Sequence, residues 1–228
     1  MDALLTRRAL IGAGLLIPVV TLPGCATGLG GLGLEDAIRR LLTISSQRAF
    51  AGLLQENGFF TDELTRIPLP PQLGGNAVRT ALSGLLGIGM VQERLLRLVN
   101  TAAANAAEAA APVVYQSIRT MSISDAVSIV RGGPTAATDF LQRSMGNAIF
   151  DALFPGIGNA LRVVDNGILS RAIQAGTGIN FAGLQQHVAS GAADAIYRAI
   201  GREEAAIRAS PASANDPVLA GIFGVLGR

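Results

Sequence analysis

The side chains that most often carry out catalysis are scarce in this sequence. Its 228 residues include one histidine, His187, and one cysteine, Cys25. A zinc site needs more nitrogen and sulfur ligands than these two residues supply. A Ser/His/Asp triad would depend on His187 alone, and no G-x-S-x-G nucleophile motif is present. On a helix His187 shares a face with Gly191, Asp194 and Arg198, so we interpret it as a surface histidine rather than a general base or ligand.

Four charged residues are the remaining candidates for chemistry: Asp125, Glu203, Glu204 and Arg208. Carboxylates that converge in a polar cleft could act as acid and base. The alternative is structural. Glu204 and Arg208 are four residues apart and can pair along one helix, and Asp125 ends the capping pattern that begins at Ser122. We favour the structural interpretation and predict no catalytic site and no metal site.

The amino terminus has the composition of an export signal. Arg7 and Arg8 precede an apolar run over residues 9–20, which is too short to span a bilayer. The paired arginines resemble a twin-arginine export signal. The sequence therefore predicts a signal peptide over residues 1–24.

Cys25 follows the sequence Leu22-Pro23-Gly24, which resembles a lipobox. A lipobox is cut directly before a cysteine that carries a diacylglycerol. We therefore predict that Cys25 is acylated and anchors the mature protein to a membrane of the cell envelope, facing the periplasm. An ordinary signal peptide with an incidental cysteine, or an uncleaved anchor, are the alternatives.

A glycine-rich tether is expected over residues 25–33. It contains Gly28-x-Gly30-x-x-Gly33, the letters of a dinucleotide-binding motif. That motif requires a preceding strand and a following helix, whereas this one follows a cleavage site. We therefore expect no nucleotide and no other cofactor.

The charges argue against a nucleic-acid partner. The chain has 18 basic residues, all of them arginine, and 16 acidic ones, which give a net charge of +2. Both signs are mixed along the expected helices, and two tyrosines without tryptophan leave little surface for base stacking.

Apolar periodicity predicts an all-α fold, a single irregular bundle of about six to eight helices over residues 34–228. The expected helices cover residues 34–57, 76–89, 90–120 with a kink or break at Pro112, a short one from Ser122–Asp125 to Gly132-Gly133, one from Thr135 that ends before Pro155-Gly156, one over 157–176 and one over 180–209. Residues 218–226 are apolar and are expected to dock on the bundle.

Residues 67–71, IPLPP, must be extended, because prolines restrict themselves and the residues before them. We interpret them as a strap across the bundle. A polyproline-type interaction motif is the alternative.

Two adjoining segments also carry a family resemblance. Met121–Ala126, followed by Gly132–Thr138, resembles the core of a bacterial family named domain of unknown function 4197. Further similar segments support it: Gly58–Phe60, Ile67–Pro70, Glu203–Pro211 and Phe223-Gly224. The resemblance covers roughly residues 35 to 224. It implies a lipoprotein-like envelope protein and no particular activity.

The sequence departs from that family in two respects. It has no lysine, and Ala192–Tyr197 stands where relatives more often show a Gly-Leu-Phe ending.

Three functions are compatible with the sequence. The first, which we favour, is a non-catalytic, lipid-anchored envelope protein that binds another envelope component. The second is a carrier of lipid or another apolar ligand, suggested by the Ala- and Gly-rich helices. The third is a hydrolase of an envelope polymer, which requires Asp125, Glu203 or Glu204 to converge in a cleft.

Overall fold

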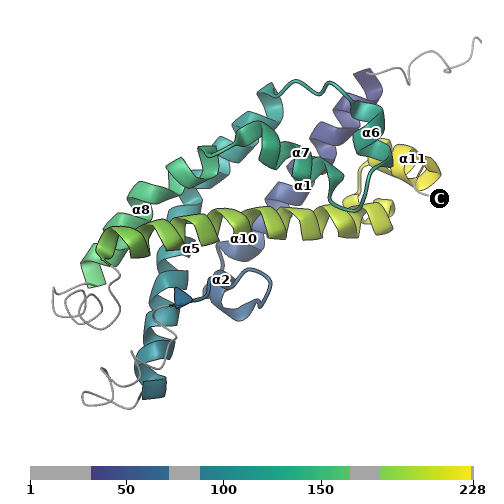
Figure 1. The fold of residues 1–228 in the computed structure, drawn as a ribbon. Coiled ribbons are helices and arrows are strands. Elements are labelled where there is room, and N and C mark those ends of the chain that lie inside the picture. The colour runs from purple at the N-terminus through teal and green to yellow at the C-terminus, as the bar shows by residue number, and fades with distance from the viewer. Residues whose placement is uncertain (1–31, 72–87, 165–179, 227–228) are drawn as a thin grey trace, which may run out of the picture.

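The computed structural model describes residues 32–71, 88–164 and 180–226 (Figure 1). Regular structure in these ranges is helical without any strand, so the predicted all-α bundle is confirmed. The elements are α1 (Leu32–Leu53), α2 (Gly58–Thr61), α5 (Ile88–Thr120), α6 (Ala126–Arg131), α7 (Ala136–Met145), α8 (Ala148–Val164), α10 (Phe181–Ala209), a 3-10 turn (Pro211–Ala214) and α11 (Pro217–Leu226). The signal peptide, most of the tether, most of the helix expected over 76–89 and the end of that expected over 157–176 lie outside the described residues.

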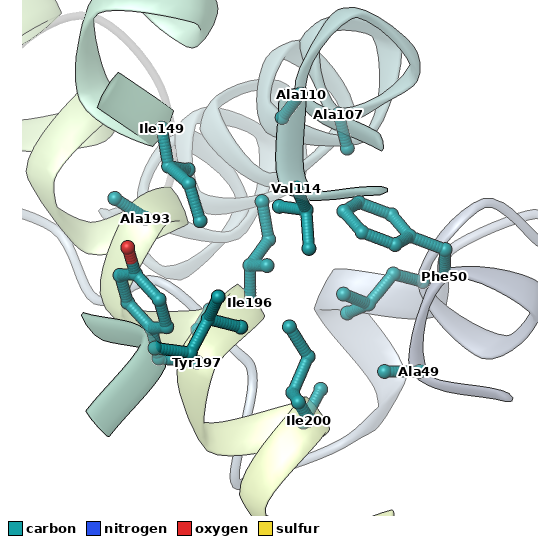
Figure 2. Close-up of a cluster of buried hydrophobic side chains, with 14 of the residues drawn as sticks. Ala49, Phe50, Ala107, Ala110, Val114, Ile149, Ala193, Ile196, Tyr197 and Ile200 are labelled. Atoms are coloured by element: carbon teal, nitrogen blue, oxygen red, sulfur yellow. The ribbon is translucent and has the colours of Figure 1, made fainter. Parts of the chain in front are cut away.

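The long helix α10 forms the centre of the bundle. It packs against α1, α7 and α8, and α5 packs along α8. Figure 2 shows Phe50 of α1, Val114 of α5, and Ile196 and Ile200 of α10 buried together. A single apolar cluster therefore includes residues from each of the four longest described helices.

Small side chains let α5 and α8 approach closely. One face of α5 buries five alanines: Ala102, Ala103, Ala106, Ala107 and Ala110. On α8, a Cβ added to Gly156 would lie 3.2 Å from the Cβ of Ala106, closer than most such contacts. At this contact the high Ala and Gly content serves helix packing.

Two prolines lie inside helices that the sequence predicted to kink or end there. α5 continues through Pro112, and the expected helix end before Pro155 is wrong because α8 continues through it. A proline has no N–H, so Pro112 leaves the carbonyl of Glu108 without its helical hydrogen bond, and Pro155 leaves that of Asp151. Both prolines and both of these residues are exposed, so water can bind the two carbonyls.

The break between α7 and α8 lies at Gly146 instead. Gly146 has a φ of 53°, a left-handed value that glycine adopts without steric cost. The apolar period continues across this residue, with Met145 and Ile149 both buried. Periodicity alone therefore predicted one helix where the structure has two.

The corner between α6 and α7 is capped differently from the prediction. Asp125, rather than Ser122, is the N-cap of α6, and its Oδ1 accepts the N–H of Ser128 at 3.1 Å. α6 ends before Gly132, as predicted, but Gly132 has a φ of −70° and does not use the left-handed region. A Cβ at Gly132 would lie 2.6 Å from the Cβ of Ala136. This glycine is therefore required for space.

The start of α1 is tied to the end of α5. Arg39 donates to the carbonyls of Ile118 and Arg119 at the end of α5, at 2.6 and 3.1 Å, and to that of Met121 just after it, at 2.7 Å. These carbonyls have no partner within their own helix, so a cation is favourable there.

The segment around Ile67 crosses α5 and α10, as predicted for a strap. The side-chain amide of Asn100 on α5 accepts the N–H of Ile67 at 2.8 Å and donates to its carbonyl at 3.0 Å. On α10, a Cβ at Gly191 would lie 2.8 Å from Cγ2 of Ile67. His187 Nε2 lies 2.9 Å from the carbonyl oxygen of Pro68. Near His187, the strap therefore packs on a face of α10 that we expected to be open surface.

Candidate functional site

Glu204 on α10 is fully buried, unlike any other charged residue in the part of the chain that the structure describes. Its Oε1 accepts the backbone N–H of Ala137 at 2.9 Å. Its Oε2 accepts the N–H of Thr138 at 2.7 Å and the Thr138 hydroxyl at 2.6 Å. Both amides belong to the first turn of α7, where no helix carbonyl can pair with them. Glu204 therefore caps α7 from another helix, with its charge at the favourable end of the helix dipole.

Arg208 lies one turn further along α10 and completes this cluster. Its Nε donates to Oε1 of Glu204 at 2.7 Å. The other guanidinium nitrogens donate to the carbonyls of Val130 and Ile129, at 2.9 and 3.0 Å, at the end of α6. The guanidinium also lies 4.8 Å from the ring centroid of Phe223 on α11. One side chain thus links α10 to α6 and α11.

The Glu204–Arg208 pair joins two segments that carry the family resemblance, Gly132–Thr138 and Glu203–Pro211. Four donors occupy the two oxygens of Glu204, and the side chain of Arg208 is only 10% exposed. A general acid or base must come within hydrogen-bonding reach of its substrate. This geometry instead holds α6, α7 and α11 against α10.

The other two candidates of the predicted cleft lie in different surroundings. Asp125 caps α6 on the exposed surface. Glu203 is partly exposed, and its Oε1 lies 3.9 Å from Nε of Arg202. Of the four residues, the structure brings only Glu204 and Arg208 into contact.

An open groove runs along α10 beside α7 and the start of α8. Two adjoining hollows of about 500 and 370 Å³ form it, and they share Gln142, Asp194 and Tyr197. Its polar lining includes Asp139, Gln142, Asn147, Gln186, Ser190 and Asp194. Neither hollow is lined by Asp125, Glu203 or Glu204.

The two arginines of the groove hold the loop after α2. Arg198 donates to the carbonyl of Leu64 at 2.8 Å, and Arg202 forms an ion pair with Asp62. The hydrogen bond from Arg202 lowers the pKa of Asp62 below its usual value. The groove therefore presents neutral amides, hydroxyls and carboxylates more than free positive charge.

Tyr197 lies beneath both hollows of the groove. It is 7% exposed, and its buried hydroxyl has no hydrogen-bond partner among the described residues. Figure 2 shows this hydroxyl directed toward Ala193 and Ile149, which line the groove. Burial, with a smaller contribution from Asp194, raises the pKa of Tyr197 to about 12, so the hydroxyl stays protonated at neutral pH.

We expect Tyr197→Phe to raise the free energy of unfolding by about 1 kcal/mol, because it removes a buried hydroxyl that has no partner. Urea denaturation followed by circular dichroism measures this change. Tyr115→Phe is the control, because Tyr115 is only partly buried, and it should change stability little. A loss of stability in Tyr197→Phe would show that the hydroxyl does have a partner in solution.

Metal binding finds no support in the described ranges. No group of three or more His, Cys, Asp or Glu side chains in residues 32–71, 88–164 and 180–226 could hold a metal ion. In the same ranges, no helix is both long enough and apolar enough to cross a membrane.

A comparison with known protein families shows which family this chain belongs to. The model of the family described as protein of unknown function (DUF4197) matches residues 30–224. The chain belongs to the DUF4197 family. The match covers the α6–α7 corner and the Glu204–Arg208 pair, which makes this pair part of the DUF4197 domain. No curated protein and no solved structure matches the chain.

Sequence reasoning assigned Glu204 to its own helix and missed its role as the cap of α7 in the DUF4197 domain. No local signal pointed to it. Thr135 is a favoured N-cap residue, and only the structure shows that its side chain forms no capping hydrogen bond. The amides of α7 therefore take their acceptor from elsewhere in the fold. The sequence cannot say which of 16 acidic residues supplies it.

Proposed function

We propose that this DUF4197 protein is a non-catalytic, lipid-anchored component of the cell envelope. Export through Arg7 and Arg8 and acylation of Cys25 place its helical domain at a membrane surface facing the periplasm. There it binds another envelope component. The lipobox-like sequence before Cys25, the chain's sole cysteine, supports the anchor.

The geometry of Glu204 is the observation that supports a non-catalytic function. It is the most enclosed carboxylate of the described residues, and burial of this kind is what tunes catalytic acids. Its oxygens are nevertheless occupied by α7 and Arg208. The hydrolase alternative also loses its motivation, because Asp125 and Glu203 make other contacts.

The carrier alternative rested on the Ala- and Gly-rich helices. Close packing of α5 on α8 accounts for that composition at Ala106 and Gly156. The hollows along α10 are open rather than enclosed, which suits a partner at the surface better than a buried acyl chain. The smaller hollow has a mainly polar surface, whereas the larger one combines its polar side chains with more apolar surface.

We place the binding surface in the α7–α10 groove. The groove is concave and has polar side chains that are free to bind a partner. Asp194, for example, is exposed and has no hydrogen bond or ion pair to any other described residue. Such a groove provides orientation and specificity for a partner with polar groups.

A Cys25→Ser variant tests the anchor. From native membranes in mild detergent, the wild-type protein should yield a mature amino terminus whose Cys25 carries acyl groups, measured by mass spectrometry. The variant should accumulate with residues 1–24 attached, because lipobox cleavage depends on the modified cysteine. An unmodified Cys25 in the wild-type protein would refute the anchor.

The same extraction tests the binding surface. We expect a stoichiometric partner to co-purify with the wild-type protein and to be lost with Asp194→Arg. Asp151→Arg is the matched control, because Asp151 is exposed on α8 outside the groove lining. A bound lipid without any protein or polymer partner would favour the carrier function instead.

A further inference from the structure

The end of the bundle nearest the membrane follows from the position of Cys25, given the proposed lipid anchor. Seven residue steps separate Cys25 from Leu32, where α1 begins. A fully extended chain spans at most about 3.6 Å per residue, so the start of α1 lies within about 25 Å of the anchor. α1 itself has 22 residues, and its other end is therefore about 33 Å further along the helix.

Two short helices surround the start of α1. α1 packs against both α6 and α11, and α6 also contacts α11 (Figure 1). Arg40 in the third turn of α1 forms ion pairs with Asp36 and with Asp216, the residue before α11. These three elements form one end of the bundle, which we call the anchor end: residues 32–40, α6 and α11.

Among the residues whose side-chain exposure the structure describes, the two most exposed large apolar ones lie at the anchor end. Val225 on α11 is 74% exposed and Val127 on α6 is 50% exposed. The next two, Leu54 and Leu64, are each 41% exposed, and Leu54 lies just beyond the opposite end of α1. Apolar exposure is therefore greatest where the tether arrives.

α11 itself has a composition suited to a lipid interface. Its sequence, PVLAGIFGVL, contains no charged residue. Leu219, Ile222 and Phe223 face the core, whereas Ala220, Gly221 and Val225 face outward. With ten residues it is too short to span a bilayer, but it can lie along one without removing a charge from water.

We propose that the anchor end rests against the bilayer that holds the acylated Cys25, with Val225 and Val127 in the interface. Two exposed valines contribute too little apolar area to bind a membrane alone. Tethering raises their local concentration at the surface, so a weak contact suffices to orient the domain. Arg40 is paired with Asp36 and Asp216, whereas Arg131 in the last turn of α6 is exposed, so attraction of Arg131 to anionic lipid can add to the apolar contact.

Site-specific fluorescence quenching tests this orientation on the acylated full-length protein. Acylation blocks the thiol of Cys25, so Val225→Cys, Val127→Cys or Leu54→Cys supplies one free thiol for an environment-sensitive dye. The labelled proteins are reconstituted in vesicles of phosphatidylcholine and phosphatidylglycerol that contain nitroxide lipids. We expect severalfold stronger quenching at positions 225 and 127 than at position 54.

Two outcomes separate this inference from the proposed anchor. If the protein floats with the vesicles but position 54 is quenched as strongly as 225, the orientation is refuted and the anchor stands. If the protein does not float, both are refuted. Val225→Asp should reduce quenching at position 127, whereas the matched Leu54→Asp should not. Equal effects of the two substitutions would also contradict the proposed contact.

Discussion

Glu204→Gln is expected to lower the free energy of unfolding by about 3–5 kcal/mol, the usual cost of breaking a buried ion pair by removing one partner. The amide keeps the shape of the side chain, but its NH₂ group meets the N–H groups of α7 or the guanidinium of Arg208, all of which are donors. Arg208 then remains 10% exposed without a counter-charge. Chemical denaturation followed by circular dichroism measures the loss. The total stability of a domain is of order 5–15 kcal/mol, so this loss would remove a large part of it.

The neighbouring carboxylate provides the matched control. Glu203→Gln makes the same chemical change at a partly exposed residue whose nearest cation is 3.9 Å away, so it should change stability by less than about 1 kcal/mol. The double variant Glu204→Gln/Arg208→Gln should lose less than the sum of the two single variants, with a coupling of about 1–3 kcal/mol. Equal effects of Glu204→Gln and Glu203→Gln would show that the buried pair does not hold the helices together.

Gly58→Ala is expected to destabilise the domain by about 3 kcal/mol. A Cβ at Gly58 would lie 2.4 Å from the carbonyl oxygen of Gly52 and 2.6 Å from that of Leu53. These are backbone atoms at the end of α1, which cannot move aside as a flexible side chain can. Displacing the turn would also pull on Phe59, which is fully buried. Thermal or urea denaturation measures the effect.

The same substitution six residues earlier should have the opposite sign. Gly52 lies inside α1, and a Cβ there would meet no atom within 4 Å. Gly52→Ala should therefore raise the free energy of unfolding by about 0.5–1 kcal/mol through the lower backbone entropy of the unfolded chain. If both substitutions act in the same direction, the close approach at Gly58 is not rigid.

Several local features were predicted correctly, and they share a cause. The last long helix begins after Asn180, whose side chain accepts the N–H of Gly183 at 2.8 Å, and it ends at Ala209 as expected. The apolar segment after residue 217 docks as α11, with Phe223 4% exposed. Caps and apolar periodicity involve residues within about one turn of each other, so they can be read along the chain.

The errors have the opposite character, because they depend on surroundings. Pro112 and Pro155 are tolerated inside helices since each lies on an exposed face. The chain breaks at Gly146, where a positive φ is used, although the sequence contains 28 glycines and nothing local distinguishes this one. His187 remains at the surface, but its contact with the strap at Pro68 was not predicted.

By itself, the sequence determined that the described chain is all helical and where most of its helices lie, because helix formation depends on neighbours three and four residues apart. The tertiary structure alone decided what the charged residues do. Glu204 reaches Ala137 across 67 positions, and Arg39 reaches Met121 across 82. Contacts of that separation exist only after the helices have packed, so no local pattern could have distinguished a helix-capping carboxylate from a catalytic one.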